Sequence, residues 1–167
     1  YEMTASLVGS EMCIRDRSKD ILKMAVVERH KNTRHIGIGY LKGYGLKSGA
    51  VATSVAHDSH NIICVGTNDE DMAFAVNRIA RNRGGIVVVE NGQVLAELPL
   101  EIAGIISGKP LREVNTLLED AKKAAHALGV GTDIDPFMTL SFMSLPVIPT
   151  LRLTTRGVVD VNTQQYV

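Results

Sequence analysis

The densest group of chemically capable side chains in this chain is the run His57-Asp58-Ser59-His60-Asn61, which we call the tip. Two imidazoles, a carboxylate, a hydroxyl and a carboxamide are the types of group that transfer protons, donate hydrogen bonds or bind metals. Asp, Ser and Asn are also ordinary turn residues, because their side chains bond to nearby backbone groups. The tip is therefore a candidate site that also has a purely structural explanation.

Three roles for the tip stay open from the sequence. It is a polar turn at the edge of a sheet, a polar contact at the border of a domain or active site, or part of a metal site. A closed zinc site takes four ligands, and two histidines with one aspartate supply three, which leaves that set incomplete. An independent His/Asp catalyst is disfavoured, because the sequence offers no identifiable nucleophile elbow or oxyanion hole.

The tip lies between two apolar runs rich in β-branched residues, within residues 50–65. Such runs on either side of polar turn formers predict two strands joined by a tight turn. If Asp58-Ser59 is a two-residue turn, His57 and His60 face each other across the ladder, with Cβ atoms about 4.5–5.5 Å apart. The predicted hairpin would then place both imidazoles on one edge.

The other elements follow from periodicity, capping residues and turn formers. We expect a strand over 21–28, a helix from Thr67 to Gly84-Gly85, a hairpin about Asn91-Gly92, a helix over 110–128, a short helix from Pro136, and strands at 151–153 and 158–161. Hairpins indicate antiparallel pairing, so the predicted fold class is α+β. It is a mixed, largely antiparallel sheet with hairpins, packed by two main helices and one or two short ones.

Three stretches carry more specific expectations. The glycines of residues 37–49 fail the Gly-x-Gly-x-x-Gly spacing, and indicate irregular connections and close backbone approaches rather than a phosphate cradle. Residues 98–107 are expected to form a short helix or a turn packed on the sheet. The helix over 110–128 presents a single apolar stripe, made by Leu111, Val114, Leu118, Ala121, Ala125 and Leu128.

Composition limits the class of protein. The 167 residues suit one domain, and the 18 basic residues balance the 18 acidic ones, which gives no basic excess for nucleic acid. No apolar run approaches the roughly 20 residues that span a bilayer. Cys13 and Cys64 form no Cys-x-x-Cys pair and suggest no disulfide framework. We expect a cytoplasmic protein with neither nucleic acid nor a membrane as partner.

Residues 1–17 differ from the rest of the chain. They have neither helical nor strand periodicity, and they lack the basic start and long apolar centre of a signal peptide. They resemble a string produced by translating sequencing-adaptor text. We therefore expect residues 1–17 to be non-native and dispensable, and residues 18–167 to form the domain.

Several stretches, in order, resemble the C-terminal domain of adenine deaminase, an enzyme of the amidohydrolase superfamily. They are residues 39–46, 54–61, 65–72, 98–104 and 142–157. The resemblance covers roughly Ile21 to Val161. It implies an enzyme that hydrolyses adenine to hypoxanthine and ammonia in a (β/α) barrel preceding this domain. In that barrel a His-x-His pair and further ligands hold manganese or iron ions, which activate water.

This chain departs from the pattern of the barrel. It has no His-x-His pair among its 5 histidines, so we assign it no metal ligand and no cofactor. The resemblance implies an accessory domain, inactive alone, that shapes the active-site border or a subunit contact. Its expected partners are the barrel of the same enzyme and further copies in a homo-oligomer, with adenine as substrate of the full-length enzyme. The alternative is a free-standing, non-catalytic binding or oligomerisation module.

Overall fold

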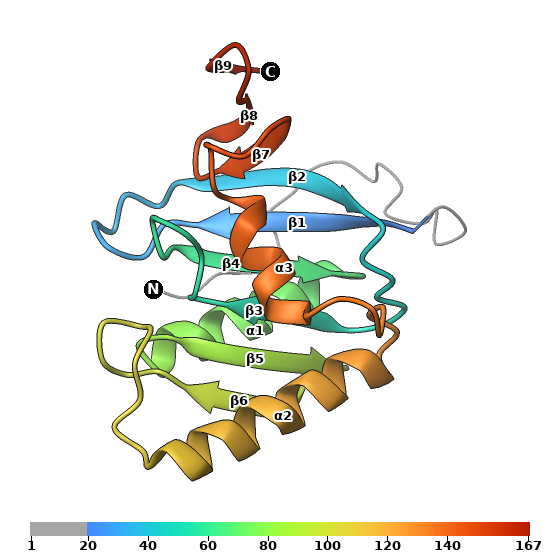
Figure 1. Ribbon diagram of the computed structural model, residues 1–167, viewed down its shortest axis with the longest axis vertical. Helices are drawn as coiled ribbons and strands as arrows, with labels where there is room; N and C mark the ends of the chain where they lie inside the picture. Colours follow the sequence, from blue (N-terminus) through green and yellow to red (C-terminus); the bar gives the residue numbers. More distant parts are fainter. Residues whose placement is uncertain (1–19) are drawn as a thin grey trace.

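A computed structural model describes residues 20–167 of the chain, so the prediction for residues 1–17 lies outside the described residues. A 6-stranded sheet in the order β2-β1-β4-β3-β5-β6 forms the centre (Figure 1). Its strands are β1 (Ile21–Val27), β2 (Ile36–Lys42), β3 (Ala50–Thr53), β4 (Ile62–Gly66), β5 (Gly85–Glu90) and β6 (Gln93–Pro99). Every pairing between these described strands is antiparallel.

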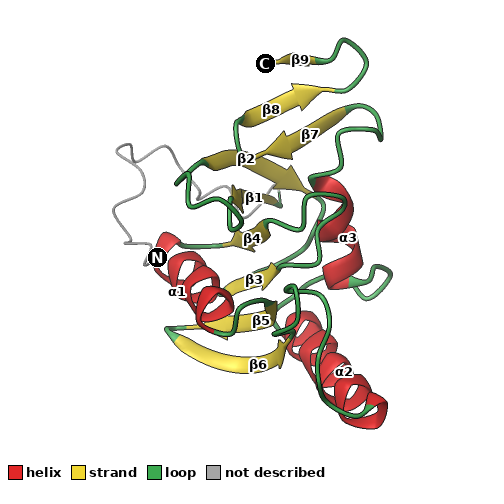
Figure 2. Ribbon diagram, turned by 90° about the vertical axis from the view of Figure 1, so that its left-hand side faces the viewer, coloured by secondary structure: helices red, strands yellow, loops and turns green. Residues whose placement is uncertain are grey.

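The helices lie on both faces of this sheet. α1 (Asp69–Arg81) covers one face, and α2 (Leu111–Ala127) with the short α3 (Pro136–Met143) covers the other (Figure 2). Strand residues alternate between two buried clusters, as the period of a strand requires. In β1, Met24 and Val26 pack toward α2 and α3, whereas Ala25 and Val27 pack toward α1. The α+β class, with two main helices and one short helix, is confirmed.

A smaller, 3-stranded sheet follows α3 and lies beyond β2 (Figure 1). It contains β7 (Leu151–Thr154), β8 (Gly157–Asp160) and β9 (Gln165–Tyr166). A Cβ atom added to Gly37 of β2 would lie 1.7 Å from the carbonyl oxygen of Thr154. Glycine therefore allows the two sheets to meet. The expected close approach is present, but the expected irregular connection is wrong for residues 36–42, which form a regular strand.

The hairpin that carries the tip is confirmed as a strand pair and corrected in its turn. β3 and β4 pair from Ala50↔Gly66 to Thr53↔Ile63. The ladder ends there, and residues 54–61 form a longer connection rather than a two-residue turn at Asp58-Ser59. The tip is therefore held by contacts to other elements, since no ladder bonds reach it.

Capping of the helices follows local chemistry closely. Asn68, one residue later than the expected Thr67, caps α1 by accepting a 2.7 Å hydrogen bond from the Asp71 backbone N–H. Asp135 caps α3 as expected, accepting from the backbone N–H groups of Phe137 and Met138. In the predicted stripe of α2 the structure contradicts one member: Leu111 is 84% exposed, because it lies in the first turn of the helix, before the helix reaches the sheet.

Residues 100–110 connect β6 to α2 without forming a helix. Within this segment the backbone N–H of Ile102 bonds to the carbonyl oxygen of Ile106 at 2.9 Å, and the two residues form an isolated bridge. The turn expected at residues 98–107 is present, and the short-helix alternative is wrong. Ile102 and Ile106 are 49% and 54% exposed, so this loop presents apolar side chains at the surface.

Candidate functional site: a rim at one end of the sheet

Four connections meet at one end of the six-stranded sheet. β1, β3 and β6 finish at this end and β2, β4 and β5 begin there, as the pairs Val27↔Ile36, Val27↔Ile62 and Gly85↔Pro99 require. The connections are residues 28–35, 54–61, 82–84 and 100–110, and we call them the rim. They lie together at the left of the sheet in Figure 1. Antiparallel pairing thus gathers segments that are far apart in the sequence.

The tip is the part of the rim that projects between β3 and β4. The backbone N–H of His57 donates to the Ser141 carbonyl at 3.2 Å, which ties the tip to α3. The imidazole centroids of His57 and His60 lie 5.8 Å apart, edge to face, and the His57 ring lies 5.4 Å from that of Phe142. The structure therefore brings both predicted imidazoles together, through a folded loop rather than across a ladder.

Arg29, which our sequence analysis did not single out, holds the tip from the opposite side. Its Nε donates to the His60 carbonyl at 2.5 Å and its Nη2 donates to the Ala103 carbonyl at 2.7 Å. Its backbone N–H lies 3.4 Å from Oδ1 of Asn61, within hydrogen-bonding range. One guanidinium thus joins three connections of the rim. In the sequence, the signal for Arg29 is that a basic residue follows the buried strand β1 by two positions, directly after Glu28.

His30 is the second rim residue that the sequence analysis missed. Its Nε2–H donates to the carbonyl oxygen of Ser59 at 2.6 Å, which fixes the tautomer of a neutral ring in this geometry. His30 is exposed. Together with His57 and His60 it makes a group of imidazoles around the tip.

His60 lies in an electrostatic setting that favours the neutral imidazole. Desolvation lowers its pKa, and the positive charges available at His57 and Arg29 lower it further, against the opposing effect of Asp58. Its Nδ1 is buried, and it finds no hydrogen-bond partner among the described residues. Buried polar atoms nearly always have a hydrogen-bond partner. We therefore expect the partner of this nitrogen to come from outside the described part of the chain.

Arg29 lies in a related setting. Burial lowers its pKa, and its acceptors are backbone carbonyls. No carboxylate of the described residues forms an ion pair with it. A half-buried guanidinium without a counter-charge attracts an anion.

The remaining tip residues face a cavity of about 420 Å³. Asp58 and Ser59 are exposed and Asn61 is 9% exposed, and all three line this cavity. Its opposite wall is the segment from Ser144 to Val147 that follows α3. The five tip residues therefore form two groups. His57 and His60 contact α3 and Arg29, whereas Asp58, Ser59 and Asn61 line the cavity.

The described residues do not fit the manganese or iron ions that the resemblance implies. Among them no group of three or more His, Cys, Asp or Glu side chains is placed to hold a metal ion. The tip offers two imidazoles and one carboxylate, and the structure does not gather these three groups into a metal-binding cluster. Cys64 is fully buried in β4, and burial raises the pKa of its thiol well above the ordinary value.

No helix of the described part is long and apolar enough to cross a membrane.

The fold defines this chain as an α+β domain whose described central strands pair only antiparallel. A profile described as "Adenine deaminase C-terminal domain" matches residues 2–165, so the chain belongs to that family. The resemblance inferred from the sequence is confirmed.

Curated relatives agree with this assignment. The chain is 54% identical over 147 residues to the adenine deaminase of Nitratidesulfovibrio vulgaris (strain Hildenborough), a match that covers 87% of the chain and 26% of the relative. It is 47% identical over 152 residues to the adenine deaminase of Bacillus subtilis (strain 168), with 91% and 26% covered. For the adenine deaminase of Desulfatibacillum aliphaticivorans the values are 46% over 170 residues, with 99% and 30% covered. The chain spans about a quarter of the length of the first two relatives.

Proposed function

We propose that this chain is the C-terminal accessory domain of an adenine deaminase, an enzyme that converts adenine and water to hypoxanthine and ammonia. The observation that carries the proposal is the match of nearly the whole chain to about a quarter of enzymes with that name. The reaction itself would belong to the remainder of the enzyme, where the manganese or iron ions that the resemblance implies would serve to activate water. Isolated, the chain is expected to release no ammonia from adenine.

The rim is the surface we assign to the border with that barrel. It combines a guanidinium at Arg29 without a carboxylate partner and an unpartnered nitrogen at His60 with exposed apolar side chains at Ile102 and Ile106. Apolar side chains beside convergent polar groups are typical of surfaces that another domain or a ligand covers. In this arrangement Arg29 fixes the tip, and the tip presents imidazole and carboxylate groups toward the active-site border or a partner subunit.

Two further expectations accompany this proposal. A homo-oligomer remains a prediction from the resemblance, with the rim or the apolar loop at 100–110 as the contact. The cytoplasm remains the predicted compartment, because the two cysteines suggest no disulfide framework.

A chimera tests the proposal directly. The matching segment of the Nitratidesulfovibrio vulgaris enzyme is replaced by residues 20–167 of this chain, and ammonia release from adenine is measured with manganese present. We expect an active chimera, whereas the same relative without the segment loses most of its turnover. His57→Gln with His60→Gln should lower turnover or subunit association in the chimera. His126→Gln, on α2 and away from the rim, should leave both unchanged.

Two results would overturn the proposal. Ammonia release by the isolated, metal-supplemented chain above a metal-only control would place the chemistry in this domain. The free-standing module would instead be supported by two results together: the chimera folds correctly but is inactive, and the isolated chain forms a stable oligomer by itself.

A further inference from the structure

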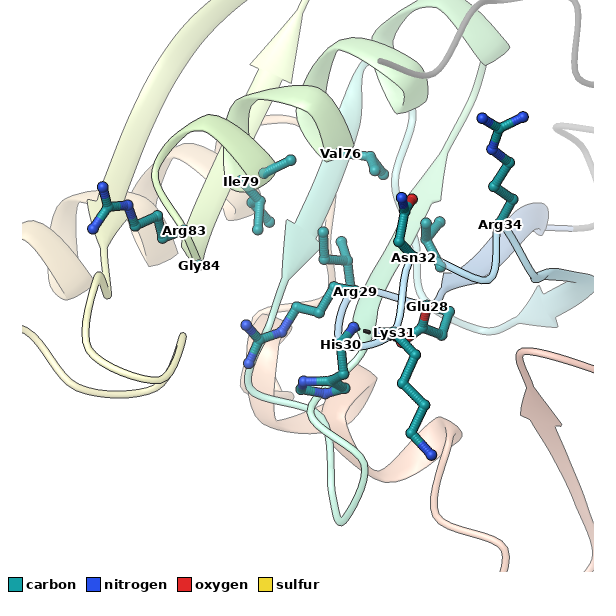
Figure 3. A pocket seen from close by; sticks show the side chains of 13 residues that line it. Glu28, Arg29, His30, Lys31, Asn32, Arg34, Val76, Ile79, Arg83 and Gly84 are labelled. Carbon is teal, nitrogen blue, oxygen red and sulfur yellow. Dashed lines mark hydrogen bonds between the residues drawn. The ribbon is translucent and has the colours of Figure 1, made fainter. Parts of the chain in front are cut away.

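A second feature of the rim is a cavity of about 650 Å³ on the side of the sheet that α1 covers. Val27, Ile62, Val76 and Ile79 lie beneath it and are no more than 2% exposed, so its apolar surface comes from the exposed Ala80 and from the methylene stems of its cationic side chains. Figure 3 shows Arg29 and His30 between Arg83 on one side and Arg34 on the other, with Lys31 nearby. The volume lies within the roughly 300–1,000 Å³ typical of small-molecule sites.

The charge around this cavity is one-sided. Its lining includes Arg29, Lys31, Arg34 and Arg83, and none of the four forms an ion pair with a described residue. Glu28 is the carboxylate of the lining, and its oxygens are turned into their own loop. They accept hydrogen bonds from the backbone N–H groups of His30, Lys31 and Thr33 at 2.5, 2.7 and 3.0 Å. The cations therefore keep a positive excess at the mouth of the cavity.

Arg29 supplies a fixed positive charge in the cavity wall. Two backbone carbonyls hold its guanidinium, and it passes directly over Gly104, where an added Cβ would lie 2.4 Å from Nη2. The N–H groups that these bonds leave free stay available for a ligand. Because the side chain is already immobilised, binding an anion there costs little further side-chain entropy.

We propose that this cavity binds the phosphomonoester of a small organic molecule of about mononucleotide size. Arg29 and Arg83 take the phosphate, because planar guanidinium groups match phosphate oxygens in bidentate pairs. The organic body lies against Ala80 and the methylene stems of the cationic side chains, above the buried Val27, Ile62, Val76 and Ile79. A concave site with a partly apolar lining favours a small molecule over an extended acidic peptide, which needs a longer charged track. Adenine carries no phosphate, so this site goes beyond the proposed reaction.

Calorimetric titration of the 167-residue chain at low ionic strength tests the proposal. The probes are AMP, adenosine and inorganic phosphate. We expect AMP to bind more tightly than phosphate, adenosine to bind least, and added salt to weaken the AMP complex. Arg83→Gln should weaken AMP about tenfold, the loss of one charge-assisted contact. Arg112→Gln, exposed on α2, is the matched control and should leave affinity unchanged.

A second measurement needs no substitution. On addition of AMP, the backbone amide resonances of residues 27–34 and 83–84 should move, and those of α2 should stay in place. Shifts elsewhere only, or no binding at millimolar AMP, would overturn the proposal. Equal affinity for AMP and phosphate would overturn the claim that the cavity binds the organic body of the ligand. Tighter binding of a hexaglutamate peptide would assign the surface to a polypeptide. These outcomes do not depend on deaminase activity in the chimera.

Discussion

The two ends of the central sheet treat their polar groups differently. At the end opposite the rim, which we call the far end, the carboxylate of Asp71 is 2% exposed and accepts from the backbone N–H groups of Asn91 and Gly92 at 3.2 and 2.7 Å. Nearby, the ammonium of Lys23 pairs with Asp69 at 2.6 Å. At the rim, Arg29 has no carboxylate partner among the described residues, and Nδ1 of His60 has no partner there at all.

At the far end the polar residues have a structural role within the domain, whereas at the rim some polar groups lack partners within the domain. At the far end each buried charged group has a hydrogen-bond or ion-pair partner within the domain, so those residues hold turns and helix starts in place. Leaving a buried polar group unpaired costs about 1–3 kcal/mol, so a fold keeps such groups only where something offsets the cost. Two buried side-chain nitrogens of the described residues lack a partner: Nδ1 of His60 at the rim and Nε of Arg152 in β7. The rim, which also holds Arg29 without a carboxylate partner, is where we place both proposals.

The largest expected effect lies at the far end. Asp71→Ala should destabilise the domain by about 3 kcal/mol, because it leaves the N–H groups of Asn91 and Gly92 unpaired and removes the partner of Asn68. Urea unfolding measures this loss. Asp133→Ala, at an exposed position, should change stability by less than about 0.5 kcal/mol. Equal losses for the two variants would remove the contrast between the ends of the sheet.

Arg29→Gln should cost less, about 1 kcal/mol. The substitution removes two hydrogen bonds to carbonyls, but it also removes a half-buried cation that no carboxylate neutralises. Hydrogen exchange should accelerate at residues 54–61 and 102–106, which the guanidinium joins, and stay unchanged in β5. A loss as large as that of Asp71→Ala would show that the rim is held as firmly as the far end.

Glu28 gives the rim a pH dependence of defined sign. Desolvation alone would raise the pKa of its carboxyl, but the backbone N–H groups of Thr33, Lys31 and His30 lower it from 4.5 to about 2. Because the folded pKa is depressed, the stabilisation is complete above about pH 4.5 and is lost as the pH falls toward 2. Glu28→Gln should lower stability at pH 7 by less than about 1 kcal/mol, since the loop is exposed to solvent.

Acid unfolding curves check this expectation. The difference between the native chain and Glu28→Gln should shrink as the pH falls from 4.5 to 2. Glu119→Gln, exposed on α2, is the control and should show no such convergence. A difference that grows in acid would contradict the assigned role of the carboxylate.

The smallest effect is expected from the tip histidines. His57→Gln with His60→Gln should change the stability of this chain by no more than about 0.5 kcal/mol, because Nδ1 of His60 makes no hydrogen bond that the change would break. Thermal unfolding measures the effect. A large loss would mean that the rings pack structurally through Phe142, and would weaken the assignment of the tip to the active-site border.

Local sequence chemistry determined much of this fold. Asn91-Gly92 forms the turn between β5 and β6, and Asp135 with Pro136 begins α3, because turn and cap residues act on backbone groups within a few positions of themselves. Most of the strands and the two long helices follow from apolar periodicity in the same way, whereas β2 and β9 were not predicted. The five tip residues were also visible as a group, since they are consecutive.

The tertiary structure decided what surrounds that group. The pairing of β1 with β4 brings Arg29 and His30 beside the tip, and no pattern within either segment encodes that pairing. The length of the turn depended on where the β3–β4 ladder ends at Thr53↔Ile63, and the exposure of Leu111 depended on where α2 meets the sheet. Each of these outcomes is a contact between residues distant in sequence. Such contacts are selected by the packing of the whole core, and short-range propensity does not contain that information.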